Sequence, residues 1–88
     1  MVNHMSQKKE EVTMSVEERY RFIRSEMVRN GISNVSISRE AKVSKQRVHD
    51  VMKCLSKGYR IRLIIAQRCN VPVEYFWPDT PIEYRRAA

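Results

Sequence analysis

The chain contains very few glycines and no long apolar run. Its 88 residues include only two glycines, Gly31 and Gly58, so it has no glycine-rich loop of the kind that cradles phosphate. No stretch approaches the roughly 20 apolar residues that a membrane-spanning helix requires. The first 14 residues contain no apolar run typical of a secretory signal. We therefore expect a cytoplasmic protein that has no membrane partner.

Cysteines are equally scarce, and the residue sets that support catalysis are missing. Cys54 and Cys69 lack the spacing of metal ligands, and each lies among apolar residues. We therefore expect two small core residues rather than a disulfide or a reactive thiol. There are no paired carboxylates in an apolar setting and no Ser-His-Asp or Cys-His set. Because so small a domain also has little room for a buried pocket, we expect no enzyme, cofactor, metal or small-molecule ligand.

Positive charge predominates, and it is concentrated in the middle of the chain. The formal net charge is +7, and two acidic residues, Glu40 and Asp50, oppose eight basic ones between residues 33 and 62. The eight are Arg39, Lys42, Lys45, Arg47, Lys53, Lys57, Arg60 and Arg62. Such a block attracts nucleic acid, because each neutralised phosphate releases condensed counterions. The alternative interpretation is a solvated surface that merely keeps the protein soluble.

The hydrophobic pattern divides the chain into three parts. Residues 1–14 are polar, of mixed charge and without a hydrophobic period, which predicts a flexible leader. Residues 15–78 carry repeated helical patterns and form the predicted domain. Residues 79–88 are expected to form a loose C-terminal tail with a basic end at Arg85 and Arg86.

The predicted domain begins with a helix after Ser15. Ser15 and Glu18 have the spacing of a capping box, in which each side chain accepts a backbone N–H of the other residue. Asn30 and Gly31 end this helix, since glycine adopts the left-handed conformation at low cost. The residues expected on its inner stripe are Val16, Tyr20, Ile23 and Met27.

Residues 33–38 are compatible with two structures. Val35 and Ile37 alternate with serines, which by period alone indicates a short strand and a winged-helix variant. The other interpretation is a helix capped by Ser33 or Asn34 and running to Ala41. We favour the helix, because Ile37 and Ala41 then lie one turn apart on a common face.

Two further helices are predicted beyond residue 43. Ser44 is a good N-cap for a helix from Lys45 to about Leu55, and a second helix covers Tyr59 to Cys69. Their expected inner residues are Val48, Val51, Met52 and Leu55 in the first, and Ile61, Ile64, Ile65 and Cys69 in the second.

A proline-bounded segment then closes the domain. Pro72 opens a short helical turn, because the N–H that proline lacks is not needed there, and Pro78 ends it. Between them, Tyr75, Phe76 and Trp77 are expected to fold back as an aromatic plug of the core.

Two segments of the chain resemble known DNA-binding proteins. The sequence Ser-Arg-Glu-Ala-Lys-Val-Ser-Lys-Gln-Arg-Val-His-Asp-Val at 38–51 resembles the helix-turn-helix of λ-repressor-like (Xre-type) domains. The segment Ala-Gln-Arg-Cys-Asn-Val-Pro-Val-Glu-Tyr-Phe-Trp-Pro at 66–78 looks like the end of phage Ner-type regulators. The resemblance covers about residues 15–78. It implies an all-α fold, a compact λ-repressor-like domain of four to five helices that contains a helix-turn-helix.

The chain departs from the family pattern at two positions. Lys42 stands where the family usually has a glycine at the turn, and a left-handed lysine costs roughly 1 kcal/mol. Ser38 replaces an alanine between the two helices, so its hydroxyl must find a backbone acceptor.

The resemblance also assigns roles to polar residues. The base-reading positions match Lys45, Gln46 and Asp50, whose expected partners are guanine, adenine and cytosine, respectively. An alternative role for Asp50 is to orient Lys53 or Arg47. The residues expected to contact phosphate are Ser33, Asn34, Ser44, Arg47, His49, Lys53, Lys57, Arg60 and Arg62.

These observations predict a sequence-specific regulator of transcription that binds double-stranded DNA. It would be of phage or mobile-element repressor type, would associate with the bacterial nucleoid, and would place residues 44–55 in the major groove. Whether it acts as a monomer or a homodimer is left open. The alternatives are a protein-interaction or antitoxin-like adaptor that uses the aromatic segment, and an excisionase-like protein that bends DNA.

Overall fold

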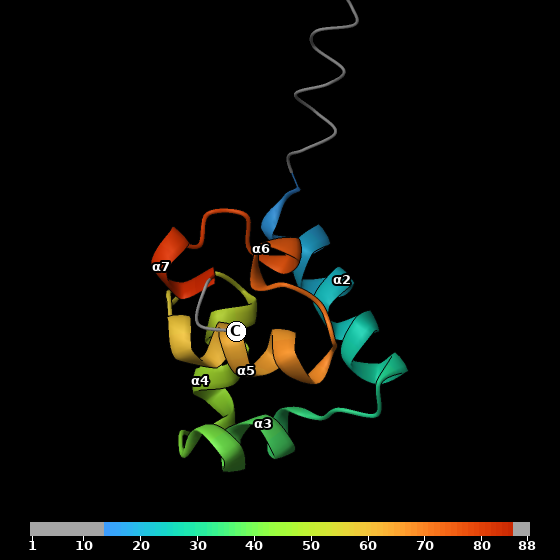
Figure 1. Cartoon of the computed structure of the whole chain (residues 1–88). Coiled ribbons are helices and arrows are strands. Elements are labelled where there is room, and N and C mark those ends of the chain that lie inside the picture. The colour runs from blue at the N-terminus through green and yellow to red at the C-terminus, as the bar shows by residue number, and fades with distance from the viewer. Residues whose placement is uncertain (1–13, 86–88) are drawn as a thin grey trace, which may run out of the picture.

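The computed structural model describes residues 14–85, which form six α-helices and no β-strand (Figure 1). The helices are α2 (Val16–Arg29), α3 (Asn34–Ala41), α4 (Lys45–Met52), α5 (Tyr59–Arg68), α6 (Val73–Phe76) and α7 (Ile82–Arg85). The all-α prediction is confirmed. The described residues contain one helix more than the expected four to five, because α7 lies in the predicted tail. No helix within residues 14–85 has the length and apolar character needed to cross a membrane.

Helix α2 begins and ends where the sequence predicts. The Ser15 hydroxyl accepts the backbone N–H of Glu18 at 3.0 Å, and the Glu18 carboxylate accepts the N–H of Ser15 at 2.9 Å. After Asn30 the chain turns at Gly31, whose φ is +70°. Only the later part of the predicted inner stripe of α2 is buried, because Ile23 is the first residue of this helix that belongs to the core. Val16, predicted to face inward, lies at the exposed start of the helix.

Residues 34–41 form helix α3, so the strand alternative is wrong. Ser33 caps the helix, and its hydroxyl accepts the N–H of Ser36 at 3.1 Å. The Ser38 hydroxyl donates to the carbonyl of Val35 at 2.8 Å, which is the backbone acceptor that this buried serine requires. Helix α3 ends at Lys42, which adopts the left-handed conformation with φ +60°.

Helix α4 is shorter than predicted. Ser44 caps it by accepting the N–H of Arg47 at 3.1 Å, but the helix ends at Met52 rather than near Leu55. The chain turns back at Cys54, where φ is +62°, and the N–H of Leu55 donates to the carbonyl of Asp50 at 2.8 Å. This closed helix end turns Cys54 and Leu55 outward. Both are exposed, so the prediction that they belong to the core is wrong.

Helices α2 to α5 and the aromatic segment all contribute to the core. All four residues predicted to face inward from the helix at 59–69 are buried, including Cys69, which forms no disulfide. Phe76 and Trp77 are also buried, which confirms their role as a plug. Tyr75 is the exception, because 53% of its surface is exposed.

The expected loose tail is packed against the domain as far as residue 85. Thr80 is only 1% exposed, and the ring of Tyr84 in α7 stacks on that of Tyr59 in α5, with 4.6 Å between centroids. Helix α7 contacts α5. Figure 1 shows α7 in the upper part of the domain and α3 at its bottom. The predicted leader, residues 1–14, lies outside the described residues except for its last, Met14, which is exposed.

Candidate nucleic-acid interface

The first turn of α4 presents polar side chains on the surface of the domain. Lys45, Gln46 and Arg47 are all exposed, whereas Val48 and Val51 on the opposite side of the helix are fully buried. In the described part of the chain, neither Lys45 nor Arg47 has an ion-pair partner. Two of the three predicted base-reading residues therefore lie together on an accessible helix turn.

The third predicted base-reading residue, Asp50, is bonded to the second. The side-chain amide of Gln46 donates from Nε2 to Oδ1 of Asp50 at 2.9 Å. The two residues lie one turn apart on the outer side of α4, and Asp50 is half-buried. The alternative in which Asp50 orients Lys53 receives no support from this arrangement, because the ammonium of Lys53 pairs elsewhere.

Lys53 joins the end of α4 to the start of α2. Its Nζ lies 2.6 Å from Oε2 of Glu17 and 4.6 Å from the centre of the Tyr20 ring. The hydrogen bond and the positive charge of Lys53 lower the pKa of the Glu17 carboxyl. Contact between Lys53 and a phosphate would therefore compete with Glu17 for the same ammonium group.

His49 faces α2 rather than the outer side of α4. Its ring meets the Tyr20 ring edge to face, with 5.4 Å between centroids. Its Nδ1 atom is buried, and within residues 14–85 it has no hydrogen-bond partner. The predicted phosphate contact from His49 would require the Nε2 side of the ring.

The predicted phosphate contacts after α4 fall into two classes. Lys57 is exposed, and its ammonium lies 3.5 Å from the Asp79 carboxylate. Arg60 is also exposed, but its guanidinium donates to the carbonyl of Ala41 and so holds the turn between α3 and α4. Lys57 keeps an accessible charge, whereas Arg60 has an evident structural role.

Arg62 does not lie on a phosphate-contacting surface. It is 2% exposed, and its Nη1 donates to Asp79 Oδ1 at 3.2 Å and to Thr80 Oγ1 at 3.1 Å. The guanidinium also lies over the Trp77 ring, 5.4 Å from its centre. The expected role of Arg62 is therefore corrected to that of an interior residue that binds the chain after Trp77. The sequence suggested a basic surface, since other basic residues lie close to Arg62 in the chain. It gave no sign of the partner Asp79, which lies 17 residues further along.

The start of α3 offers a second polar region. Ser33 is exposed and Asn34 is half-buried, with an Oδ1 atom that has no hydrogen-bond partner among the described residues. Both line a groove of about 260 Å³, which Arg24 of α2 also lines. The sequence interpretation did not include Arg24, since nothing in the α2 pattern distinguishes it from the other exposed arginines of that helix.

The candidate interface therefore consists of the first turn of α4, which Ser44 caps and which carries accessible polar residues. Some of the basic residues around it already bind other groups of the protein. Among the described residues, no group of three or more His, Cys, Asp or Glu side chains is placed to hold a metal ion. Comparison with protein families, curated proteins and solved structures yields no match to this chain.

Proposed function

We propose that the protein is a sequence-specific regulator that binds double-stranded DNA through α4. The observation that carries this proposal is the division of α4 into two faces. Val48, Val51 and Met52 are each 0% exposed, while the first turn presents Lys45 and Gln46 to solvent. The B-DNA major groove, about 12 Å wide, admits such a helix and displays a distinct pattern of donors and acceptors for each base pair.

The connection between α3 and α4 supports a rigid presentation of this helix. The turn comprises three residues, 42–44, and both sides of it are hydrogen-bonded: Arg60 binds the carbonyl of Ala41, and Ser44 caps α4. Buried Ile37 and Ala41 pack the two helices together. A pre-formed helix loses little conformational entropy on binding, which favours affinity.

Charge at the start of α4 supports phosphate contact beside the groove. The free N–H groups of a helix N-terminus favour anions, and Ser44, Lys45 and Arg47 surround that end of α4. Regulation would then follow from occupancy of an operator, which blocks or redirects other proteins on the DNA. A dimer on such a site would read two half-sites about one helical turn apart.

Selection of random double-stranded DNA on the purified full chain, at physiological salt, tests this proposal. We expect a recovered motif, and we expect Gln46→Ala to lose about 1–3 kcal/mol of discrimination at one position of it. Gln67→Ala is the matched control, because Gln67 is an exposed glutamine on α5 rather than on α4. Recovery of no motif, or of the same preference with Gln46→Ala, would contradict the proposal.

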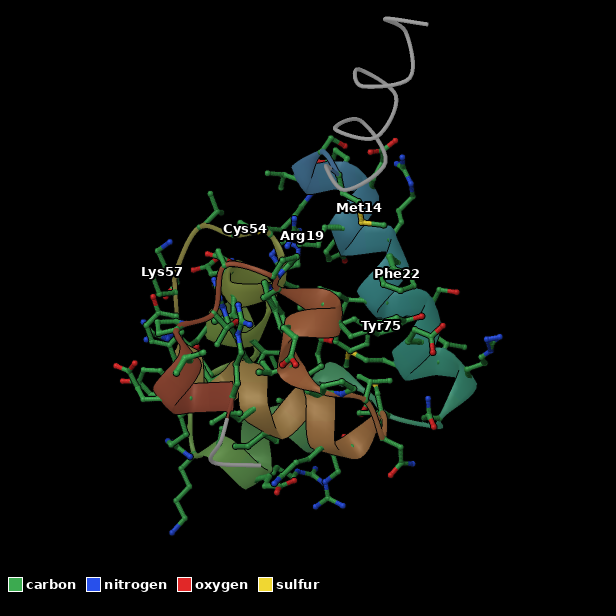
Figure 2. The ribbon with its side chains drawn as sticks, turned by 45° about the horizontal axis from the view of Figure 1, so that its top comes forward. Met14, Arg19, Phe22, Cys54, Lys57 and Tyr75 are labelled. Carbon is green, nitrogen blue, oxygen red and sulfur yellow. The ribbon has the colours of Figure 1, made fainter. Side chains whose placement is uncertain are left out.

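One observation favours a second candidate function, that of a protein-interaction module. Tyr75 is 53% exposed and meets Phe22 of α2 edge to face, with ring centres 5.3 Å apart (Figure 2). Exposed aromatic side chains are enriched in protein interfaces. In this case Tyr75→Ser would abolish a protein interaction without changing DNA binding. The antitoxin-like and adaptor alternatives belong to this class, whereas strong bending of a bound DNA fragment would indicate the excisionase-like alternative.

A further inference from the structure

The hydrogen bond between Gln46 and Asp50 gives the proposed interface a definite base preference. We propose that Asp50 is a positioning residue, which orients the Gln46 amide to bind adenine and prevents it from binding guanine. This inference rests on the proposed function, since it concerns the same face of α4. It assigns Asp50 a role that differs from direct reading of cytosine.

The orientation of the Gln46 amide follows from the chemistry of its partner. An ionised carboxylate accepts hydrogen bonds and cannot donate them. The Gln46 atom that lies 2.9 Å from Asp50 Oδ1 must therefore be the nitrogen, because two oxygens in contact would repel each other. Asp50 thus excludes the flipped amide, in which Oε1 would take the position of Nε2.

Once bonded to Asp50, Gln46 retains one N–H donor and one carbonyl acceptor for DNA. Adenine presents the complementary pair in the major groove, with N7 as the acceptor and the N6 amino group as the donor. The Gln46 amide matches both when Nε2 donates to N7 and Oε1 accepts from N6. The partner base pair is therefore adenine with thymine.

Guanine is excluded because Asp50 occupies one of the two Nε2 hydrogens. Guanine presents two acceptors, O6 and N7, in the major groove. A free glutamine satisfies both by donating both hydrogens of its amide nitrogen. Gln46 has only one hydrogen left, and its oxygen would face a guanine acceptor. The specificity thus depends on a residue that need not touch the base.

A hydrogen bond between residues four apart on a helix also has a structural role, because such pairs stabilise exposed helices weakly. Loss of the Asp50 charge will in addition raise affinity for all DNA, since a repulsion with phosphate disappears. Neither effect distinguishes adenine from guanine. The ratio of the two affinities at one position, rather than affinity itself, therefore reports the positioning role.

The test measures dissociation constants for two duplexes that differ only in adenine or guanine, at the position that Gln46→Ala identifies. We expect the unmodified protein to favour adenine and Asp50→Ala to reduce this ratio about tenfold, the scale of one bidentate contact. Asp50→Glu retains an acceptor-only carboxylate and should keep most of the ratio. Glu83→Ala is the charge control, because it removes an exposed carboxylate from α7 instead of α4.

The outcomes separate this inference from the function on which it rests. An unmodified protein that selects no sequence would overturn both. An unmodified protein that selects a motif, but whose ratio is unchanged by Asp50→Ala, would overturn the positioning role alone. The positioning role would also be overturned if Asp50→Ala instead abolished a preference for cytosine at a neighbouring base pair. That result would make Asp50 a base-reading residue. Circular dichroism of each variant checks that the overall helix content is retained.

Discussion

Arg62 and Asp79 form an ion pair between the interior and the surface of the domain. The Arg62 guanidinium is 2% exposed, whereas the Asp79 side chain is 50% exposed, and 3.2 Å separates Nη1 of the arginine from Oδ1 of the aspartate. The same guanidinium binds Thr80, whose hydroxyl donates to the Trp77 carbonyl at 2.7 Å. This network holds residues 79–85 on the domain and compensates a charge that would otherwise be buried without a partner.

Removal of the carboxylate should therefore destabilise the whole domain. We expect Asp79→Ala to lower the free energy of unfolding by about 2 kcal/mol, less than the roughly 3–5 kcal/mol typical of a fully buried pair, because Asp79 is half exposed. Urea unfolding followed by circular dichroism measures the change. Glu83→Ala, in the exposed helix α7, should change stability by less than about 0.5 kcal/mol. Equal stability of Asp79→Ala and the unmodified protein would contradict the network.

Two carboxyl groups make the domain sensitive to acid. Partial burial raises the pKa of Asp79, but the charge and hydrogen bond of Arg62 lower it. A hydrogen bond to the backbone of Asp79 and the charge of Lys57 also lower this pKa, so that the net shift is downward. The hydrogen bond and charge of Lys53 lower the pKa of Glu17. Near and below about pH 4, the ordinary carboxyl range, the unfolded chain therefore binds more protons than the folded protein. Stability should be fully present above that range and should fall as the pH drops through the folded pKa values.

Urea midpoints measured between pH 7 and pH 3 check this direction. The double variant Glu17→Gln, Asp79→Asn should be less stable at neutral pH, and it should lose less of its stability on acidification. The same acid loss in the variant and the unmodified protein would show that other groups control the transition.

The two glycines differ in what a side chain would meet. Both have positive φ, +70° at Gly31 and +41° at Gly58, so alanine at either position should cost about 1 kcal/mol of backbone strain. At Gly31 the added methyl would meet no atom within 4 Å, but at Gly58 it would collide with the side chain of Val51. We expect Gly58→Ala to cost a further 1–3 kcal/mol or so, the usual range for overpacking. Thermal unfolding of the two variants tests the difference, and equal melting temperatures would refute it.

The two cysteines should react at very different rates. Cys54 is exposed at the end of α4, whereas Cys69 is 4% exposed. Burial, and then the negative charge of Glu26, raise the pKa of the Cys69 thiol and so lower its thiolate fraction. A thiol reagent should therefore modify one cysteine per chain in the folded protein and two in urea. The assignment would be contradicted if the rapidly reacting thiol were still present in Cys54→Ser and were lost in Cys69→Ser.

Local sequence determined where the first three helices begin. Ser15, Ser33 and Ser44 each accept an N–H from the first turn of the helix that follows, and these contacts span three residues. The spacing of apolar residues likewise identified most of the core, because helical periodicity is a property of neighbouring positions. Leu55 is an exception, because it was predicted to be buried and is exposed. The chain turns back at Cys54, one residue earlier, and this ends the helical periodicity.

For the candidate site, the resemblance assigned Lys45 and Gln46 to base reading and Arg47 to phosphate contact, and the structure shows all three exposed on the first turn of α4. DNA binding itself stays a prediction. Only the tertiary structure decided which charged residues are committed to the protein: Lys53 binds Glu17 across 36 residues, and Arg62 binds Asp79 across 17. No local pattern encodes these pairs, because each depends on how two distant segments of the chain pack. The sequence thus determined the helices and their polar faces, and packing determined which of those charges remain free to bind a partner.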